Sequence, residues 1–144
     1  MTPAFLGATL AIAAVTVLGG CSGPPTNSSR DVRVGDERWT VLLAGRDGMR
    51  GMADFQGADG MLFDFDRDID PDAVAFVMDG VAFPLDIAWF TDAGELVDMT
   101  TMPVCPAKPC PTYTADGRYR WAIEAPVGAF RDLPSDARLD VSPD

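Results

Sequence analysis

Short apolar runs, some alternating with polar residues, are separated along the chain by turn-forming Gly, Pro and Asp. The runs at residues 39–43, 60–65 and 119–125 each predict a β-strand, because successive strand side chains point to opposite faces. Alternation is clearest in the third run, where three large apolar residues occupy every second position: Tyr119, Trp121 and Ile123.

Residues 76–102 predict two consecutive β-hairpins. In the first, Asp79 and Gly80 lie between two apolar runs, which is the strongest short signal for a two-residue turn with positive φ at both central residues. That turn would place Met78 opposite Val81.

The second hairpin is predicted to turn at residues 92–94, with Gly94 as the left-handed residue of a bulge. The register that keeps one face apolar pairs Trp89 with Val97 and Ile87 with Met99. It leaves four residues on the other face: Asp86, Ala88, Asp98 and Thr100. A four-residue loop would instead mix polar and apolar residues on both faces, so we prefer the first register.

One short helix is predicted over residues 46–55, where Met49, Met52 and Phe55 recur at three-residue spacing around Gly51. Many short strands with Gly, Pro and Asp turns, together with this helix, predict an all-β fold. We expect a mainly antiparallel, compact, jelly-roll-like sandwich or barrel forming a single domain over residues 37–144.

Several motifs in a fixed order make the chain similar to a known family. They are Arg50-Gly51-Met52, Gly60-Met61-Leu62-Phe63, Phe76-x-Met78, Pro84-Leu85-Asp86, Met102-Pro103 and Tyr119-x-x-x-Ile123-Glu124. In order and spacing they resemble the bacterial and archaeal family known as domain of unknown function 192, from residue 39 to the C-terminus. This family has no established activity, so the resemblance implies no molecular function.

The chain departs from the family pattern at two motifs. Residues 77–81 read Val-Met-Asp-Gly-Val where the family usually has Trp-Met-Lys-Asn-Thr, and Met52 follows Gly51 where the family has Leu-Met. A Lys and an Asn available to a shared polar site of the family are therefore missing. Arg50, Asp86 and Glu124 match motif positions and are the candidate site residues that the resemblance adds.

The N-terminus predicts export and lipidation. Residues 1–20 contain no charged side chain, and their apolar segment is shorter than the roughly 20 residues that span a bilayer. The sequence Leu-Gly-Gly before Cys21 matches a bacterial lipobox, although an ordinary cleavable signal is the alternative. We expect a lipoprotein signal peptide (1–20), a lipidated Cys21 and a flexible tether (21–36), with anchoring at the cell membrane or outer membrane.

Charge and composition exclude several functions. The 144 residues include 22 acidic and 11 basic side chains, no His, and a net charge of −11. This balance repels phosphate backbones, so we exclude nucleic-acid partners and expect a soluble monomer. Without His, serine or cysteine hydrolase machinery is excluded, and the sequence favours a protein that is not an enzyme and holds no cofactor.

Cys105 and Cys110 are predicted to form a disulfide, because two Cys so close together in an exported, Pro-stiffened loop usually pair. A redox role is the sharper alternative. A zinc site is disfavoured because no His is present to complete it.

Weak metal binding is a further alternative. Five Asp alternate as in the start of a calcium loop: Asp64, Asp66, Asp68, Asp70 and Asp72. Ile69 stands where such a loop needs Gly, so a solvated charged turn is the preferred interpretation. Methionine pairs at 49 and 52 and at 99 and 102 could bind copper, but packing is the commoner use of such residues.

Asp86 and Asp98, sharing one sheet face in the predicted register, could act as the two carboxylates of a glycoside hydrolase. Arg50 and Glu124 could form either a buried structural pair or an anion-recognition site. Taken together, the sequence favours a lipid-anchored extracytoplasmic domain with a binding or accessory role toward an envelope ligand or protein. A carboxylate-dependent hydrolase of envelope glycans is the alternative enzyme hypothesis.

Overall fold

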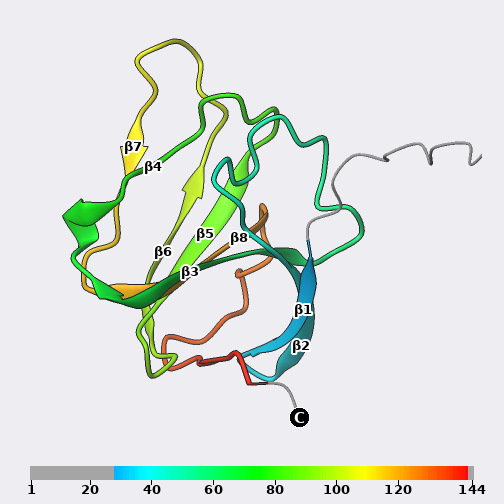
Figure 1. Ribbon diagram of the computed structural model, residues 1–144, viewed down its shortest axis with the longest axis vertical. Coiled ribbons are helices and arrows are strands. Elements are labelled where there is room, and N and C mark those ends of the chain that lie inside the picture. Colours follow the sequence, from blue (N-terminus) through cyan, green and yellow to red (C-terminus); the bar gives the residue numbers. More distant parts are fainter. Residues whose placement is uncertain (1–27, 143–144) are drawn as a thin grey trace, which may run out of the picture.

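The computed structural model of the protein describes residues 28–142. Its strands are β1 (Ser29–Val34), β2 (Glu37–Leu43), β3 (Gly60–Ile69), β4 (Phe76–Val77), β5 (Leu85–Phe90), β6 (Leu96–Met102), β7 (Thr112–Tyr113), β8 (Tyr119–Pro126) and β9 (Leu139–Asp140). Seven of them form one curled sheet in the order β6-β5-β8-β3-β2-β1-β9, and β4 pairs with β7 apart from it (Figure 1). All pairings are antiparallel except that of β2 with β3. The predicted compact β fold is confirmed, with a mixed rather than purely antiparallel sheet.

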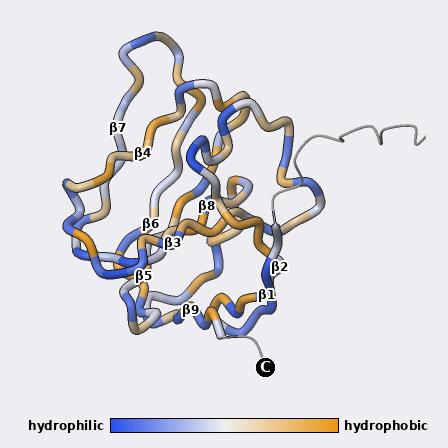
Figure 2. Tube along the Cα trace, viewed as in Figure 1, coloured by the Kyte–Doolittle hydropathy of each residue, from blue (hydrophilic) through white to orange (hydrophobic). Residues whose placement is uncertain are grey.

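The interior strand β5 is buried on both faces, because its sequence is apolar at every position except Asp86. Leu85, Ile87 and Trp89 belong to one core cluster, together with Met49, Phe76 and Tyr119 among others. Alternate residues of β5 belong to a second cluster with β1, β2 and the segment after β8. In Figure 2 the hydrophobic stretches follow the central strands, while hydrophilic stretches gather on the outer turns. The sheet therefore separates two cores.

The strands predicted at residues 39–43, 60–65 and 119–125 are confirmed as β2, β3 and β8. β3 continues further than predicted, through the acidic segment to Ile69. Among residues 28–142 the only helical segment is the short 3-10 turn η1 (Pro71–Ala73). None of the described residues forms a helix that is long and apolar enough to cross a membrane.

The predicted helix over residues 46–55 is wrong. Three consecutive turns replace it, closed by the amides of Gly48, Arg50 and Met52, each of which donates to the carbonyl three residues earlier. Gly48 and Gly51 have φ values of +53° and +73°, which a right-handed helix does not allow. Met49 nevertheless has only 1% of its surface exposed, so the spacing of apolar residues predicted burial but not conformation.

The first predicted hairpin is also wrong, although its turn exists. The Val81 amide donates to the Met78 carbonyl at 3.3 Å, but only Gly80, at +75°, has positive φ. Positive φ at the third turn residue alone is typical of a type II turn, which does not match the twist of a hairpin. The chain therefore leaves the turn, and Phe76 pairs instead with Tyr113 of β7.

The second hairpin has the predicted loop but a different register. The Gly94 amide donates to the Thr91 carbonyl at 2.8 Å, and Gly94 has φ of +82°. A bulge then shifts the pairing, so that Trp89 lies opposite Asp98 and Ala88 opposite Met99. Because β6 is an edge strand with little buried surface, the core constrains its register weakly. Met99, predicted to point inward, is 41% exposed.

The folded domain begins earlier than predicted. β1 lies within the predicted tether (21–36), and its Val32 and Val34 are buried in the second core. Alternating Val with charged residues gives this strand one apolar face, which packs in the second core, while its two edges pair with β2 and β9. The predicted signal peptide (1–20), Cys21 with its predicted lipidation and the start of the predicted tether lie outside the described residues.

Candidate functional site

A cleft of about 550 Å³ lies beside the first core, where three segments distant in sequence meet. Its walls come from the turns after β2, from β3 and from the segment that leads through β4 to the Asp79-Gly80 turn. We call it the Glu124 cleft. Four residues of the motifs shared with the family line it: Arg50, Phe63, Phe76 and Glu124.

The sheet register places Glu124 in apolar surroundings. On β8, Glu124 lies opposite Met61 of β3 and Ile87 of β5, and both neighbours are completely buried. Gly60 allows β3 to approach closely, since a Cβ atom there would lie 2.7 Å from the carbonyl oxygen of Glu124. Glu124 is 6% exposed, and its carboxylate has no hydrogen-bond or ion-pair partner among residues 28–142.

Burial changes the acidity of this carboxyl group. Removal of water from the charged form raises the pKa of Glu124 from 4.5 to about 7. The group is therefore partly ionised near neutral pH. It could accept a proton, donate one, or present a charge to a ligand.

The wall beside Glu124 is aromatic. Phe63 and Phe76 pack edge to face with ring centroids 5.3 Å apart, and Phe65 packs against Phe76 at 6.4 Å. All three rings line the cleft. The turn at Gly48 rests on this wall, because a Cβ atom at Gly48 would lie 3.2 Å from the Phe63 ring.

The charges at the rim are largely paired with each other. Arg50 contacts Asp79 at 3.4 Å, and Lys108 contacts the other oxygen of Asp79 at 3.1 Å. The predicted Arg50–Glu124 pair therefore does not form, although both residues line the same cleft. The ion pair between Asp79 and Lys108 was not predicted from the sequence. The signal that could have suggested it is the acidic residue Asp79 at a position where the family usually has Lys, because a carboxylate there can attract a cation.

Asp86 lies on the other face of the sheet and is held by two hydrogen bonds. Its carboxylate accepts one from the Thr101 hydroxyl at 2.6 Å and one from the Gly128 amide at 2.7 Å. These contacts join β5 to β6 and to the turn after β8, so Asp86 serves the structure. The bulged register places Asp98 on the Trp89 face instead. The two-carboxylate geometry required by the hydrolase hypothesis is thus absent, and we abandon that hypothesis.

The acidic run from 64 to 72 does not converge on a point. Asp64 accepts from the Asp66 amide at 2.8 Å and pairs with Arg120, whereas Asp68 accepts from the Asp92 amide. Asp70 pairs with Arg118. No group of three or more potential His, Cys, Asp or Glu ligands occurs within residues 28–142. The run is a charged strand and turn rather than a calcium loop.

The disulfide between Cys105 and Cys110 is present, with Cα atoms 5.4 Å apart. Its loop carries Lys108 to Asp79 at the rim of the Glu124 cleft. This loop, distant from the cleft in sequence, therefore contributes to the charge of its rim.

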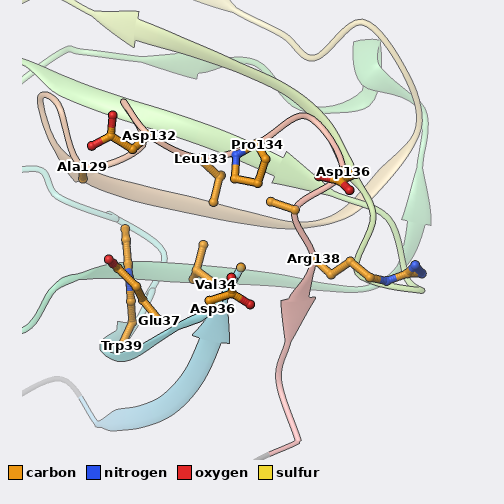
Figure 3. A pocket seen from close by; sticks show the side chains of 12 residues that line it. Val34, Asp36, Glu37, Trp39, Ala129, Asp132, Leu133, Pro134, Asp136 and Arg138 are labelled. Atoms are coloured by element: carbon orange, nitrogen blue, oxygen red, sulfur yellow. The ribbon is translucent and has the colours of Figure 1, made fainter.

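A second hollow, also about 550 Å³, lies between the β1–β2 turn and the segment after β8 (Figure 3). Val34 and Leu133 face each other across it, and Asp36, Glu37 and Asp136 lie around it. Trp39, which lines the hollow, stacks on Phe130 with ring centroids 5.4 Å apart. None of the candidate site residues predicted from the sequence lines this hollow.

Two solved structures share the fold. One, a proposed transcription regulator from Sinorhizobium meliloti 1021, has a TM-score of 0.68 and 19% identity, covering 82% of this chain and 97% of its own. The other, a protein of unknown function from Novosphingobium aromaticivorans DSM 12444, has a TM-score of 0.65 and 17% identity, covering 92% and 93%. No curated protein matches.

A sequence profile matches residues 40–140, a span that includes the lining of the Glu124 cleft and residues 76–102. That profile represents domain of unknown function 192, described as "Uncharacterized ACR". The chain therefore belongs to the domain of unknown function 192 family.

Proposed function

We propose that this protein is a lipid-anchored, extracytoplasmic, monomeric binding protein of the cell envelope, and that the Glu124 cleft holds a small organic ligand. One observation carries the second part of this proposal: Glu124, a residue that is 6% exposed and whose carboxylate is unpaired among the described residues, lines a cleft of about 550 Å³. The lipobox ending at Cys21 and the absence of His support the anchored, non-enzymatic part.

An unpaired buried carboxylate is costly for a small domain. Taking a charge out of water without a partner destabilises the fold by several kcal/mol unless the group is neutralised. Sequences that retain such a group commonly use it, and perturbed acids in clefts are candidate binding residues. The cleft size and its aromatic wall suit a ligand of the size of a metabolite.

The regulatory role proposed for the Sinorhizobium protein does not extend to this chain. The likeness at 19% identity concerns the fold. A net charge of −11, from 22 acidic and 11 basic residues, opposes binding to nucleic acid.

Membrane anchoring can be tested by intact-mass analysis of the membrane fraction. We expect a protein that begins at Cys21 and carries acyl chains, and a Cys21→Ala variant that loses both the mass increment and the membrane association. A soluble product cleaved at another position would refute the anchoring.

Ligand binding can be tested by a thermal-shift screen of small metabolites with the full chain. We expect compounds that raise the melting temperature of the wild type and not that of Glu124→Gln. Glu95→Gln is the matched control, because Glu95 is an exposed residue outside the cleft, and within residues 28–142 it forms an ion pair with Arg138 alone. Compounds that stabilise all three proteins equally would place the ligand elsewhere.

A further inference from the structure

We propose that the ligand of the Glu124 cleft is an organic cation, a protonated amine or guanidinium attached to an apolar or aromatic body. This inference rests on the proposed function, because it specifies the ligand of the same cleft. Its evidence is the combination of an unpartnered buried carboxylate with a wall of aromatic rings.

The first step concerns the carboxylate. Between Met61 and Ile87, Glu124 finds neither a cation nor a hydrogen-bond donor among the described residues. In such apolar surroundings an opposite charge compensates a carboxylate more fully than a neutral donor does, because Coulomb attraction is weakly screened there. The desolvation of Glu124 has already occurred on folding, so the ligand meets a prepared partner.

The second step concerns the aromatic wall. Phe63, Phe65 and Phe76 line the cleft, and their edge-to-face packing fixes their orientations. Faces of aromatic rings carry negative partial charge and attract cations, while their apolar surface suits an uncharged ligand body. Aromatic rings and a carboxylate together form an arrangement that suits organic cations.

The third step concerns the other charged groups of the cleft. From the turns after β2 come Arg46, Asp47 and Arg50, from β3 comes Asp64, and from the turn after β4 comes Asp79. Arg50 is engaged by Asp79, and Asp64 is engaged by Arg120. These lining groups, with ionised Glu124, comprise four carboxylates and two guanidinium groups. Lys108 and Arg120 pair with two of these carboxylates, so the charges of the cleft and its rim balance. The buried charge left without a partner is that of ionised Glu124, which favours a cation over an anion.

The test compares three probes of one shape: phenethylamine, the neutral 2-phenylethanol and the anionic phenylacetate. Each is titrated calorimetrically into the full chain at pH 8. We expect the amine to bind at least tenfold more tightly than the alcohol and phenylacetate not to bind. Glu124→Gln should weaken amine binding at least tenfold, whereas Glu95→Gln should leave it unchanged.

A second measurement follows amine binding as the carboxyl group is protonated. With a pKa of about 7, the ionised fraction of Glu124 falls about tenfold between pH 8 and pH 6. Amine affinity should fall by about the same factor in the wild type and stay constant in Glu124→Gln.

The outcomes separate the two proposals. If the alcohol or phenylacetate binds in a manner that depends on Glu124 and the amine does not, the cation inference is wrong but the binding function stands. If none of the three probes binds the wild type, the cation inference is refuted, whereas the binding function is refuted only by a thermal-shift screen that finds no compound dependent on Glu124. If the amine binds Glu124→Gln as tightly as the wild type, the cation is held elsewhere and this inference fails.

Discussion

Replacement of Glu124 by Gln should stabilise the protein in a strongly pH-dependent manner. The change keeps the shape of the side chain and removes its ability to ionise. In the wild type the folded state holds the Glu124 proton up to a pKa of about 7, whereas the unfolded chain releases it near 4.5. The folded state therefore binds more protons between these values, and wild-type stability falls as pH rises through this window.

The magnitude follows from the difference between the two pKa values. Each pKa unit corresponds to 1.36 kcal/mol, so the penalty grows from near zero below pH 4.5 to about 3 kcal/mol above pH 8. Because Gln carries no charge, the variant lacks this penalty at every pH. Any cost of burying the Gln amide lowers the free energy of unfolding of the variant by the same amount at every pH. It therefore leaves the pH dependence unchanged.

Urea denaturation of wild type, Glu124→Gln and the exposed control Glu95→Gln at pH 5, 6, 7 and 8 provides the measurement. We expect the free energy of unfolding of Glu124→Gln minus that of wild type to rise by about 2 to 3 kcal/mol from pH 5 to pH 8. The Glu95→Gln difference should stay flat. Parallel curves for wild type and Glu124→Gln would show that the carboxyl group is solvated or paired, and would remove the basis for both proposals.

Three further stability changes follow from other contacts, each measurable by urea denaturation. Replacing Cys105 and Cys110 by Ala should lower the free energy of unfolding by about 2 kcal/mol, since the disulfide closes a short loop; no loss would show that it adds no constraint. Asp86→Ala should cost about 2 kcal/mol by removing two part-buried hydrogen bonds to a carboxylate, whereas Asp98→Ala on the edge strand should change stability by less than about 0.5 kcal/mol. Equal losses would contradict the register. Tyr119→Phe should raise stability by about 1 kcal/mol, because the Tyr119 hydroxyl is buried without a partner among the described residues; a loss would indicate a hydrogen bond.

Strands formed by long apolar runs were predictable because burial dominates their conformation. β2, β3 and β8 each carry enough apolar surface to specify a strand without knowledge of their partners. Pairing over long distances was not predictable. Phe76 finds its partner at Tyr113, and the local Asp79-Gly80 signal is compatible with two turn types, only one of which makes a hairpin.

The site could be predicted only in part for the same reason. The family motifs identified Arg50 and Glu124, and the structure places both on one cleft. Their relation depends on neighbours that the sequence does not reveal. Met61 and Ile87, which lie beside Glu124 on the neighbouring strands, reach it only through the sheet order β5-β8-β3.

The ion pairs that Asp79 forms at the rim of the Glu124 cleft bear on why the buried Glu124 carboxylate has no cationic partner. Where the family usually has Lys, this chain has Asp79, which contacts Arg50 on one side and Lys108 of the disulfide loop on the other. These pairs are more than one third exposed on their cationic side, so they contribute little to stability. Their effect is instead to engage two cations at the rim. The buried Glu124 carboxylate is thereby left without a protein cation among the described residues, and its compensating charge has to come from a proton or from a ligand.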